Sequence, residues 1–244
     1  MKQKQILSLA IISLLIISTP NTLTSQTEEG NWLAEGNLGN INLSNNKNES
    51  TYGTNTSKSE NQGYYISLYP RIGYFISDNF VLGTTLNFSY QSNKYKSYSD
   101  NGVKSRDEIY NRSGIGLSPF LRYYFTENSK NRLYGQLGGG INNYKSTSNT
   151  TLFNYLGDIN GTEKMSGKEK VISGEVLIGF NHFFTENVAF NSSIGYGYGY
   201  GKRTYNYTYG GINSLPQETK YTTGNVIWNF GFTIIIAIKK DETN

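Results

Sequence analysis

The residue-by-residue alternation of bulky apolar side chains with small or polar ones is the feature that most restricts how this chain can fold. It is clearest in residues 80–91, and it recurs in residues 112–125, 188–199 and 225–238. One face of 80–91 carries Phe80, Leu82, Thr84, Leu86, Phe88 and Tyr90, and the other carries Val81, Gly83, Thr85, Asn87, Ser89 and Gln91. Because successive side chains of a strand point to opposite faces, the pattern predicts strands with one apolar and one polar face.

The polar face of these strands is a poor hydrophobic core. It consists mostly of Gly, Ser, Asn and Gln with a few charged residues, and Phe120 is an apolar exception. A soluble barrel fills its interior with apolar side chains, whereas a membrane barrel turns its apolar face to lipid and keeps a polar interior. The 21 Tyr, 12 Phe and 27 Gly, in a chain with a mean hydropathy of −0.52, fit the membrane barrel.

Two kinds of connection alternate along the chain. Three segments with adjacent aromatics end in Ser or Thr, an acid and Asn, which is tight-turn chemistry; they lie at 73–79, 123–128 and 182–187. Four stretches rich in Ser, Thr, Asn, Lys and Gly are interpreted as long polar loops; they lie at 44–62, 91–108, 145–170 and 202–220. Short turns on one side and long loops on the other are typical of outer-membrane barrels. The prediction is an all-β fold, an eight-stranded antiparallel transmembrane up-and-down β-barrel.

The N-terminal stretch has the pattern of a secretory signal peptide. Lys2 and Lys4 precede an apolar run at 6–17, which is too short to span a bilayer as a helix. We expect a signal peptide at residues 1–25 and a barrel domain at residues 26–244; a retained membrane anchor is the alternative.

Aromatic residues gather next to the predicted short turns, where one membrane interface of a barrel is expected. The predicted periplasmic girdle consists of Tyr74, Phe75, Tyr123, Phe125 and Phe184. An ordinary β-sandwich, in which aromatics only stabilise strands, is the alternative interpretation.

Three charged residues are predicted to meet inside the barrel. Arg71 and Arg122 lie shortly before the aromatics that end their strands, and Glu35 lies near the start of the first strand. A rise of about 3.3 Å per residue and a tilt of about 40° place all three at a similar height near the periplasmic end. Buried charges must be paired and hydrogen-bonded, so an ionic cluster is expected there. It could be a plug or gate for ions, or a filler that fixes strand register.

Several chemistries lack the residues that they need. The chain has no cysteine and one histidine, so thiolate sites and histidine-rich metal sites are excluded. That histidine, His182, is expected beside the periplasmic turn and on the lipid face, which is the wrong place for a catalytic base at the outer rim. The loop carboxylates lack the spacing of a calcium loop, and a dispersed net charge of +4 does not indicate nucleic acid. We expect no enzyme activity, no cofactor and no metal site.

The segments PRIGYFISDN at 70–79 and PFLRYYF at 119–125 resemble the small outer-membrane β-barrel domains of Gram-negative bacteria, of OmpA/OmpX type. The resemblance covers nearly the whole mature chain, but its motifs carry no reaction. It implies secretion across the inner membrane, insertion by the barrel assembly machinery, and a monomer surrounded by outer-membrane lipid and lipopolysaccharide. The C-terminal aromatic that is common in this family is absent, because the last strand ends Ile236-Ala237-Ile238 and a tail follows.

Two functions are compatible with this sequence. The first is a structural or surface-interaction role, in which a packed polar lumen supports four mobile extracellular loops that could bind a ligand the sequence does not identify. The second is transport, through a narrow pore or by a lateral route for small hydrophobic molecules. Eight strands leave an interior just wide enough for side chains, which argues against a wide channel.

Overall fold

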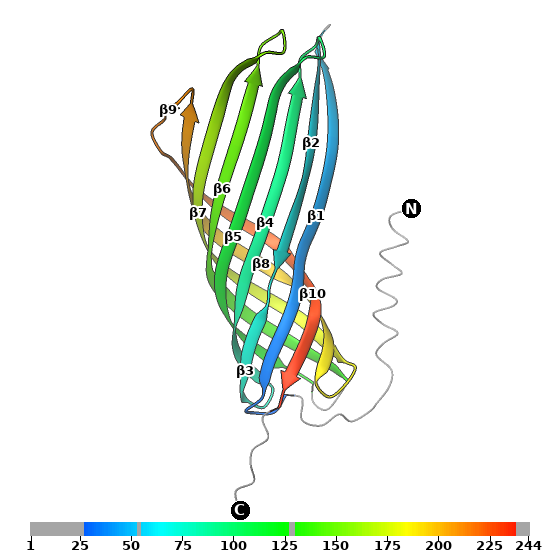
Figure 1. Cartoon of the computed structure of the whole chain (residues 1–244). Helices are drawn as coiled ribbons and strands as arrows, with labels where there is room; N and C mark the ends of the chain where they lie inside the picture. The colour runs from blue at the N-terminus through cyan, green and yellow to red at the C-terminus, as the bar shows by residue number, and fades with distance from the viewer. Residues whose placement is uncertain (1–26, 53–54, 127–129, 238–244) are drawn as a thin grey trace, which may run out of the picture.

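The computed structural model describes residues 27–52, 55–126 and 130–237, and the predicted signal peptide lies outside them. The described residues form one antiparallel sheet rolled into a barrel (Figure 1). Its strands are β1 (Trp32–Tyr52), β2 (Asn55–Leu68), β3 (Arg71–Ser77), β4 (Phe80–Tyr98), β5 (Lys104–Tyr124), β6 (Asn131–Phe153), β7 (Ile159–Phe183), β8 (Val188–Tyr209), β9 (Ile212–Asn213) and β10 (Gln217–Ile236). Within them, no helix is long and apolar enough to cross a membrane.

The ten strands make a ring of eight, because β2 and β3 together form one strand of the ring and β9 lies outside it. This confirms the predicted eight-stranded antiparallel barrel. β2 and β3 are two parts of one path, interrupted at Tyr69 and Pro70. Proline has no backbone N–H for the ladder, and β1 has a register shift opposite this break, between Leu38 and Ile41. β9 is a two-residue strand that pairs only with the end of β8. The ring closes where β1 pairs with β10, from Trp32 and Ile236 to Leu38 and Phe230.

The stretches predicted to be four mobile loops are largely strand, so that part of the prediction is wrong. Most of 44–62, 91–108, 145–170 and 202–220 continues the membrane strands as long paired hairpins. Their Ser, Thr and Asn residues suggest loops by composition, but the successive residues of these stretches still have partners across an antiparallel ladder. The connections are therefore short on both sides, and the polar residues form a sheet that stands above the barrel.

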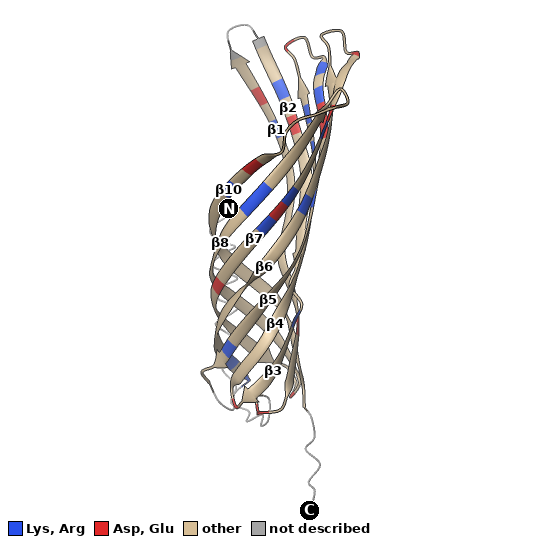
Figure 2. Cartoon of the chain, turned by 90° about the vertical axis from the view of Figure 1, so that its left-hand side faces the viewer, with Lys and Arg blue, Asp and Glu red and all other residues tan. Residues whose placement is uncertain are grey.

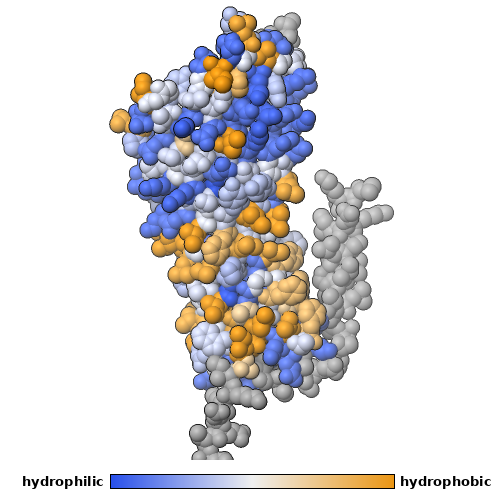
Figure 3. Space-filling model, in the orientation of Figure 1, coloured by the Kyte–Doolittle hydropathy of each residue, from blue (hydrophilic) through white to orange (hydrophobic). Residues whose placement is uncertain are grey.

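Every strand of the ring carries exposed apolar residues in its lower part, and on the face drawn in Figure 3 they form an apolar belt below a mainly hydrophilic upper half. On β10 the outward row runs from Val226 to Ile236, all exposed apolar residues. That stretch rises about 25 Å at a tilt of about 40°, which is the height of the apolar band of an outer-membrane barrel, about 25 Å. Charged residues lie mostly above the belt or at its base (Figure 2).

The five residues of the predicted girdle do not all face outward. Tyr74, Tyr123, Phe125 and Phe184 lie on the outer surface near the base. Phe75 is fully buried inside the barrel, so its place in the girdle is a wrong prediction. Adjacent residues of a strand face opposite sides, so a pair of neighbouring aromatics supplies one ring to the lipid and one to the lumen.

Phe120, the apolar exception on the polar face, also points into the lumen and is almost fully buried. The cross-strand neighbour Gly83 makes room for it: a Cβ atom on Gly83 would lie only 2.4 Å from the Phe120 ring. The base of the lumen thus holds an aromatic layer that includes Phe75, Phe120, Tyr124 and Tyr134.

Candidate functional site in the barrel lumen

The charged residues predicted to meet inside the barrel lie together at its base. Arg122 on β5 donates two parallel hydrogen bonds to the Glu35 carboxylate on β1, from Nη1 to Oε1 at 2.5 Å and from Nη2 to Oε2 at 2.9 Å. Arg71 on β3 lies 3.5 Å from Glu35 Oε2. All three side chains are buried. We call this group the basal cluster: Glu35, Arg71 and Arg122.

Neutral groups satisfy the remaining positions of the basal cluster. Gln136 Oε1 accepts from Arg122 Nε at 3.0 Å and from Nη2 at 2.8 Å, and the Thr233 hydroxyl donates to Glu35 at 2.9 Å. The Arg122 guanidinium also lies 4.0 Å from the centre of the Tyr134 ring, which is a cation–π contact. Such a dense arrangement of bonded, buried groups closes the lumen at this height.

The basal cluster carries one more positive charge than negative within its three residues. The nearest compensation is Glu175 on β7, whose carboxylate accepts a hydrogen bond from Gln136 at 3.3 Å. Gln136 therefore connects Arg122 to a second carboxylate one layer higher, and the negative charge of Glu175 offsets the excess positive charge of the basal cluster.

A second ionic cluster lies higher in the lumen. Glu169 on β7 accepts from Arg112 on β5 at 2.8 Å and from Arg203 on β8 at 2.8 Å, and Tyr221 on β10 donates to the same carboxylate. Arg112 is stacked on the ring of Tyr144, 3.9 Å from its centre. Burial opposes the charged form of Arg203, but the Glu169 carboxylate raises its pKa above the usual value. We call this group the upper cluster: Arg112, Glu169, Arg203 and Tyr221.

Little in the amino-acid sequence indicates the upper cluster. Glu169 stands between Lys168 and Lys170 in a stretch that looks like a solvated loop. Only the strand parity separates them: Glu169 shares a face with Val171 and points inward, whereas the two lysines point outward. Arg112 likewise points inward, as its contact with Glu169 shows.

A polar cavity of about 200 Å³ lies between the two clusters. Arg71, Thr85 and Glu175 line its lower part, and Tyr144 and Val171 line its upper part. The wall between them is built of small and amide side chains, among them Asn87, Ser118, Asn142 and Ser173. The cavity is large enough for several waters or one small molecule.

The same cavity reaches a seam where the barrel wall is not paired. Within the described residues, β1 and β10 pair only up to Leu38 and Phe230. Above this point β1 pairs with β2 and β10 pairs with β8, and the two strands diverge (Figure 1). The cavity is lined by Asn40 on the β1 side and by Thr223, Asn225 and Ile227 on the β10 side. We call this stretch the unpaired seam.

The unpaired seam begins inside the apolar belt. Beyond the last pair, β1 still presents Ile41 and Leu43 outward, 60% and 80% exposed, and β10 presents Trp228 and Val226 outward, 53% and 69% exposed. These residues would contact lipid, so the seam faces the bilayer rather than the solvent above it.

His182 lies near the base, as expected. Its Nδ1 is 2.8 Å from the Asn131 side chain, and its ring packs edge-on against Phe184. Within the described residues, no group of three or more His, Cys, Asp or Glu side chains could hold a metal ion.

Comparisons with known proteins give matches in structure only. No protein-family model and no curated protein matches the chain. The crystal structure of the outer membrane protein OprG from Pseudomonas aeruginosa is 14% identical, covers 86% of this chain and 98% of its own, and has a TM-score of 0.47. The outer membrane protease OmpT from Escherichia coli is 10% identical, covers 89% of this chain and 100% of its own, and has a TM-score of 0.38. Identities and TM-scores this low carry no argument about activity.

The protein is a transmembrane β-barrel. Its apolar belt, its polar lumen and its antiparallel ring are the properties that membrane barrels require.

Proposed function

We propose that this barrel is a lateral conduit for small, partly apolar molecules. A molecule enters the polar cavity from the extracellular side and leaves through the unpaired seam into the outer leaflet. The observation that carries the proposal is the end of β1–β10 pairing at Leu38 and Phe230, within the apolar belt.

The closed base favours a lateral route through the barrel wall rather than a pore along the barrel axis. The basal cluster and the aromatic layer around it are buried, so they block the straight path to the periplasm. A molecule in the cavity above them lies next to the unpaired seam, whose two edges line that cavity.

The energetics of the bilayer also support a functional seam. Each unpaired backbone N–H or C=O in the hydrocarbon region costs several kcal/mol, which is why membrane barrels normally close. Irregular backbone at membrane depth is tolerated where it lines a polar cavity, and the polar cavity here extends along this seam.

A cross-link across the seam tests the proposal. The chain has no cysteine, so introduced pairs are unambiguous. In a Leu43→Cys, Val226→Cys variant, a bifunctional maleimide would tie the two edges of the seam together. The matched control is Tyr196→Cys, Val226→Cys, which links residues that already pair between β8 and β10.

The readout is the rate at which a small fluorescent naphthylamine enters the outer membrane of cells that display each variant. Cross-linking Leu43 to Val226 is expected to reduce the protein-dependent rate to background, and the control cross-link is expected to leave it unchanged. Equal rates for both cross-linked forms would overturn the proposal.

A surface-interaction role is the second candidate. The hairpins β1–β2 and β4–β5 continue above the belt, and the cross-strand ion pairs Lys47–Glu60 and Lys58–Glu49 join β1 to β2. They present an ordered polar sheet at the cell surface, which suits contact with another surface and needs no seam. The seam cross-link separates the two roles, because it would leave adhesion of displaying cells intact.

The remaining parts of the proposal concern location and assembly. We propose that residues 1–25 direct secretion across the inner membrane and that the assembly machinery inserts the barrel as a monomer without a catalytic role. Fractionated cells are expected to contain the protein in the outer membrane, with residues 1–25 removed. A full-length chain in the inner membrane would contradict the proposal.

A further inference from the structure

Five lysines lie on the outer wall just above the apolar belt. Strand parity turns their side chains outward on four neighbouring strands: Lys145 on β6, Lys168 and Lys170 on β7, Lys202 on β8 and Lys220 on β10. Register makes them adjacent, because Lys145 pairs with Lys168, Lys170 with Lys202, and Lys202 with Lys220. We call these five residues the lysine patch.

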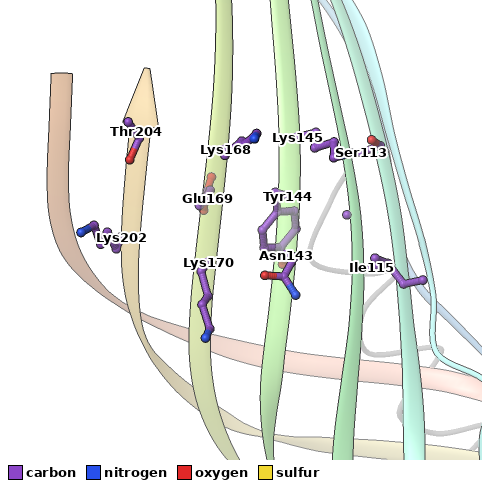
Figure 4. Close-up of a pocket in the computed structure, with 11 residues that line it drawn as sticks. Ser113, Ile115, Asn143, Tyr144, Lys145, Lys168, Glu169, Lys170, Lys202 and Thr204 are labelled. Atoms are coloured by element: carbon purple, nitrogen blue, oxygen red, sulfur yellow. The ribbon is translucent and has the colours of Figure 1, made fainter. Parts of the chain in front are cut away.

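Four lysines of the patch line a shallow groove of about 650 Å³ (Figure 4). Ser113, Asn143 and Thr204 add polar groups, and Ile115 adds an apolar one; Gly114, Tyr144 and Glu169, which have the inward parity, complete the lining. Most of these side chains share the outward parity of the lysines, so the groove lies on the outer wall and not in the lumen.

The charge of the patch is poorly compensated. Like charges directly opposite one another on paired strands are destabilising, and this sheet contains three such pairs in a row. Among the described residues, no carboxylate lies within 4 Å of the amino groups of Lys145, Lys168 or Lys170; Glu169 points inward to the upper cluster. Lys202 is paired with Glu218 at 2.8 Å, and that hydrogen bond lowers the pKa of Glu218.

The place of the patch restricts what can neutralise it. Toward the membrane, the paired residues Ile141, Ile172 and Tyr200 are exposed and apolar; their row lies one register step from the Lys170–Lys202 pair and two from the Lys145–Lys168 pair. A partner that contacts both the lysines and the apolar row below them needs an anionic headgroup and an apolar part beneath it. A lipid of the outer leaflet has this structure.

We propose that the lysine patch is a binding site for the phosphorylated headgroup of an outer-leaflet glycolipid of the lipid A type. Its phosphates contact Lys145, Lys168 and Lys170 in the groove, and its acyl chains lie along the apolar residues of β6, β7 and β8. The site rests on the position of the barrel in the membrane and is independent of the lateral conduit.

Lipid A binding to the refolded full barrel tests this site. The protein is placed in phosphatidylcholine vesicles that contain a small fraction of lipid A, and co-purifying lipid A is quantified by native mass spectrometry. The test variant is Lys145→Gln, Lys168→Gln, Lys170→Gln. The control variant is Lys94→Gln, Lys96→Gln, Lys164→Gln, which removes the same number of positive charges. Lys94 and Lys164 lie on one row of the sheet, about 13 Å further from the belt along the strands than the Lys145–Lys168 pair.

The test variant is expected to bind lipid A about a hundred-fold more weakly, as for the loss of three lysine contacts at a membrane surface. The control variant and the wild type are expected to bind alike, and enzymatically dephosphorylated lipid A is expected to lose its preference over phosphatidylcholine. Heat-modifiability on a gel establishes that each variant is folded.

Three results would overturn the proposal: equal lipid A binding by the test and control variants, equal binding of dephosphorylated lipid A, or displacement of lipid A by millimolar inorganic phosphate. The last result would make the patch a site for free phosphate rather than for a lipid.

Discussion

At the scale of single residues, the barrel interior depends on one bidentate ion pair. Glu35 and Arg122 come from strands far apart in the sequence and meet only when the ring is closed. Removing one partner of a buried pair leaves an uncompensated charge, whereas replacing both partners removes the charge altogether.

We therefore predict that Glu35→Gln lowers the free energy of unfolding by about 3–5 kcal/mol, because the buried Arg71 and Arg122 then lose the carboxylate that they share. The triple variant Glu35→Gln, Arg71→Met, Arg122→Met is expected to recover part of that loss, because none of the three charges of the basal cluster then remains. Urea unfolding in lipid vesicles measures both effects. A triple variant that is less stable than Glu35→Gln by the full cost of two further mutations would contradict this account.

A second prediction concerns Gly83, because its lack of a side chain leaves the space that the Phe120 ring occupies. A Cβ there would lie 2.4 Å from the Phe120 ring and 2.5 Å from the backbone oxygen of Ile72. Gly83→Ala is expected to destabilise the barrel by about 1–3 kcal/mol through overpacking.

Gly36→Ala is the matched control for Gly83→Ala, since nothing lies within 4 Å of a Cβ at Gly36. It is expected to change stability by less than about 0.5 kcal/mol. Equal effects of the two substitutions in the same urea titration would refute the packing role of Gly83.

At the scale of strands and hairpins, the sequence predicted the membrane part well and the upper part poorly. Bulky residues such as Leu82, Leu86 and Phe88 alternate with small ones, and that contrast shows both the strand and its lipid face. Above the belt both faces are polar, so composition alone cannot separate a strand from a loop. The ladder partner decides it, and the partner is a property of the fold.

The extracellular hairpins are expected to contribute little to the stability of the barrel. Their cross-strand ion pairs, such as Lys47–Glu60, are solvent-exposed, and exposed pairs contribute about 0–1 kcal/mol. Replacing residues 46–60 with a short turn should leave the temperature of the gel mobility shift within a few degrees. A truncated chain that fails to show a heat-modifiable band would place essential folding contacts in the hairpin.

The basal cluster shows how far sequence reasoning reaches into the site. Parity and distance from the turns were enough to predict that Glu35, Arg71 and Arg122 meet. The upper cluster was not predicted, because Glu169 stands between two lysines in a stretch that looks like a solvated loop. The unpaired seam was not predicted, because it depends on the register shift between Leu38 and Ile41 and on the divergence of β10 from β1. No local pattern reports how two strands from opposite ends of a chain separate.

At the scale of the whole molecule, the barrel combines a closed base with a wall that is incomplete within the bilayer. Refolded protein in a planar bilayer is therefore expected to show no single-channel steps, since the basal cluster and aromatic layer leave no straight path. Replacing Arg71 and Arg122 with Ala is expected to introduce small steps. Steady conductance of the wild type would contradict a closed base.

The central claim is that β1 and β10 are separated at the level of the outer leaflet. The most direct test is a distance measurement by pulsed electron spin resonance in lipid vesicles, with nitroxide labels on Leu43→Cys and Val226→Cys, compared with labels on the hydrogen-bonded pair Tyr196→Cys and Val226→Cys. We predict a clearly longer distance across the seam than between the paired strands, whose Cα atoms lie about 5 Å apart. The same short distance for both pairs would mean that the barrel is closed there, and it would contradict the account.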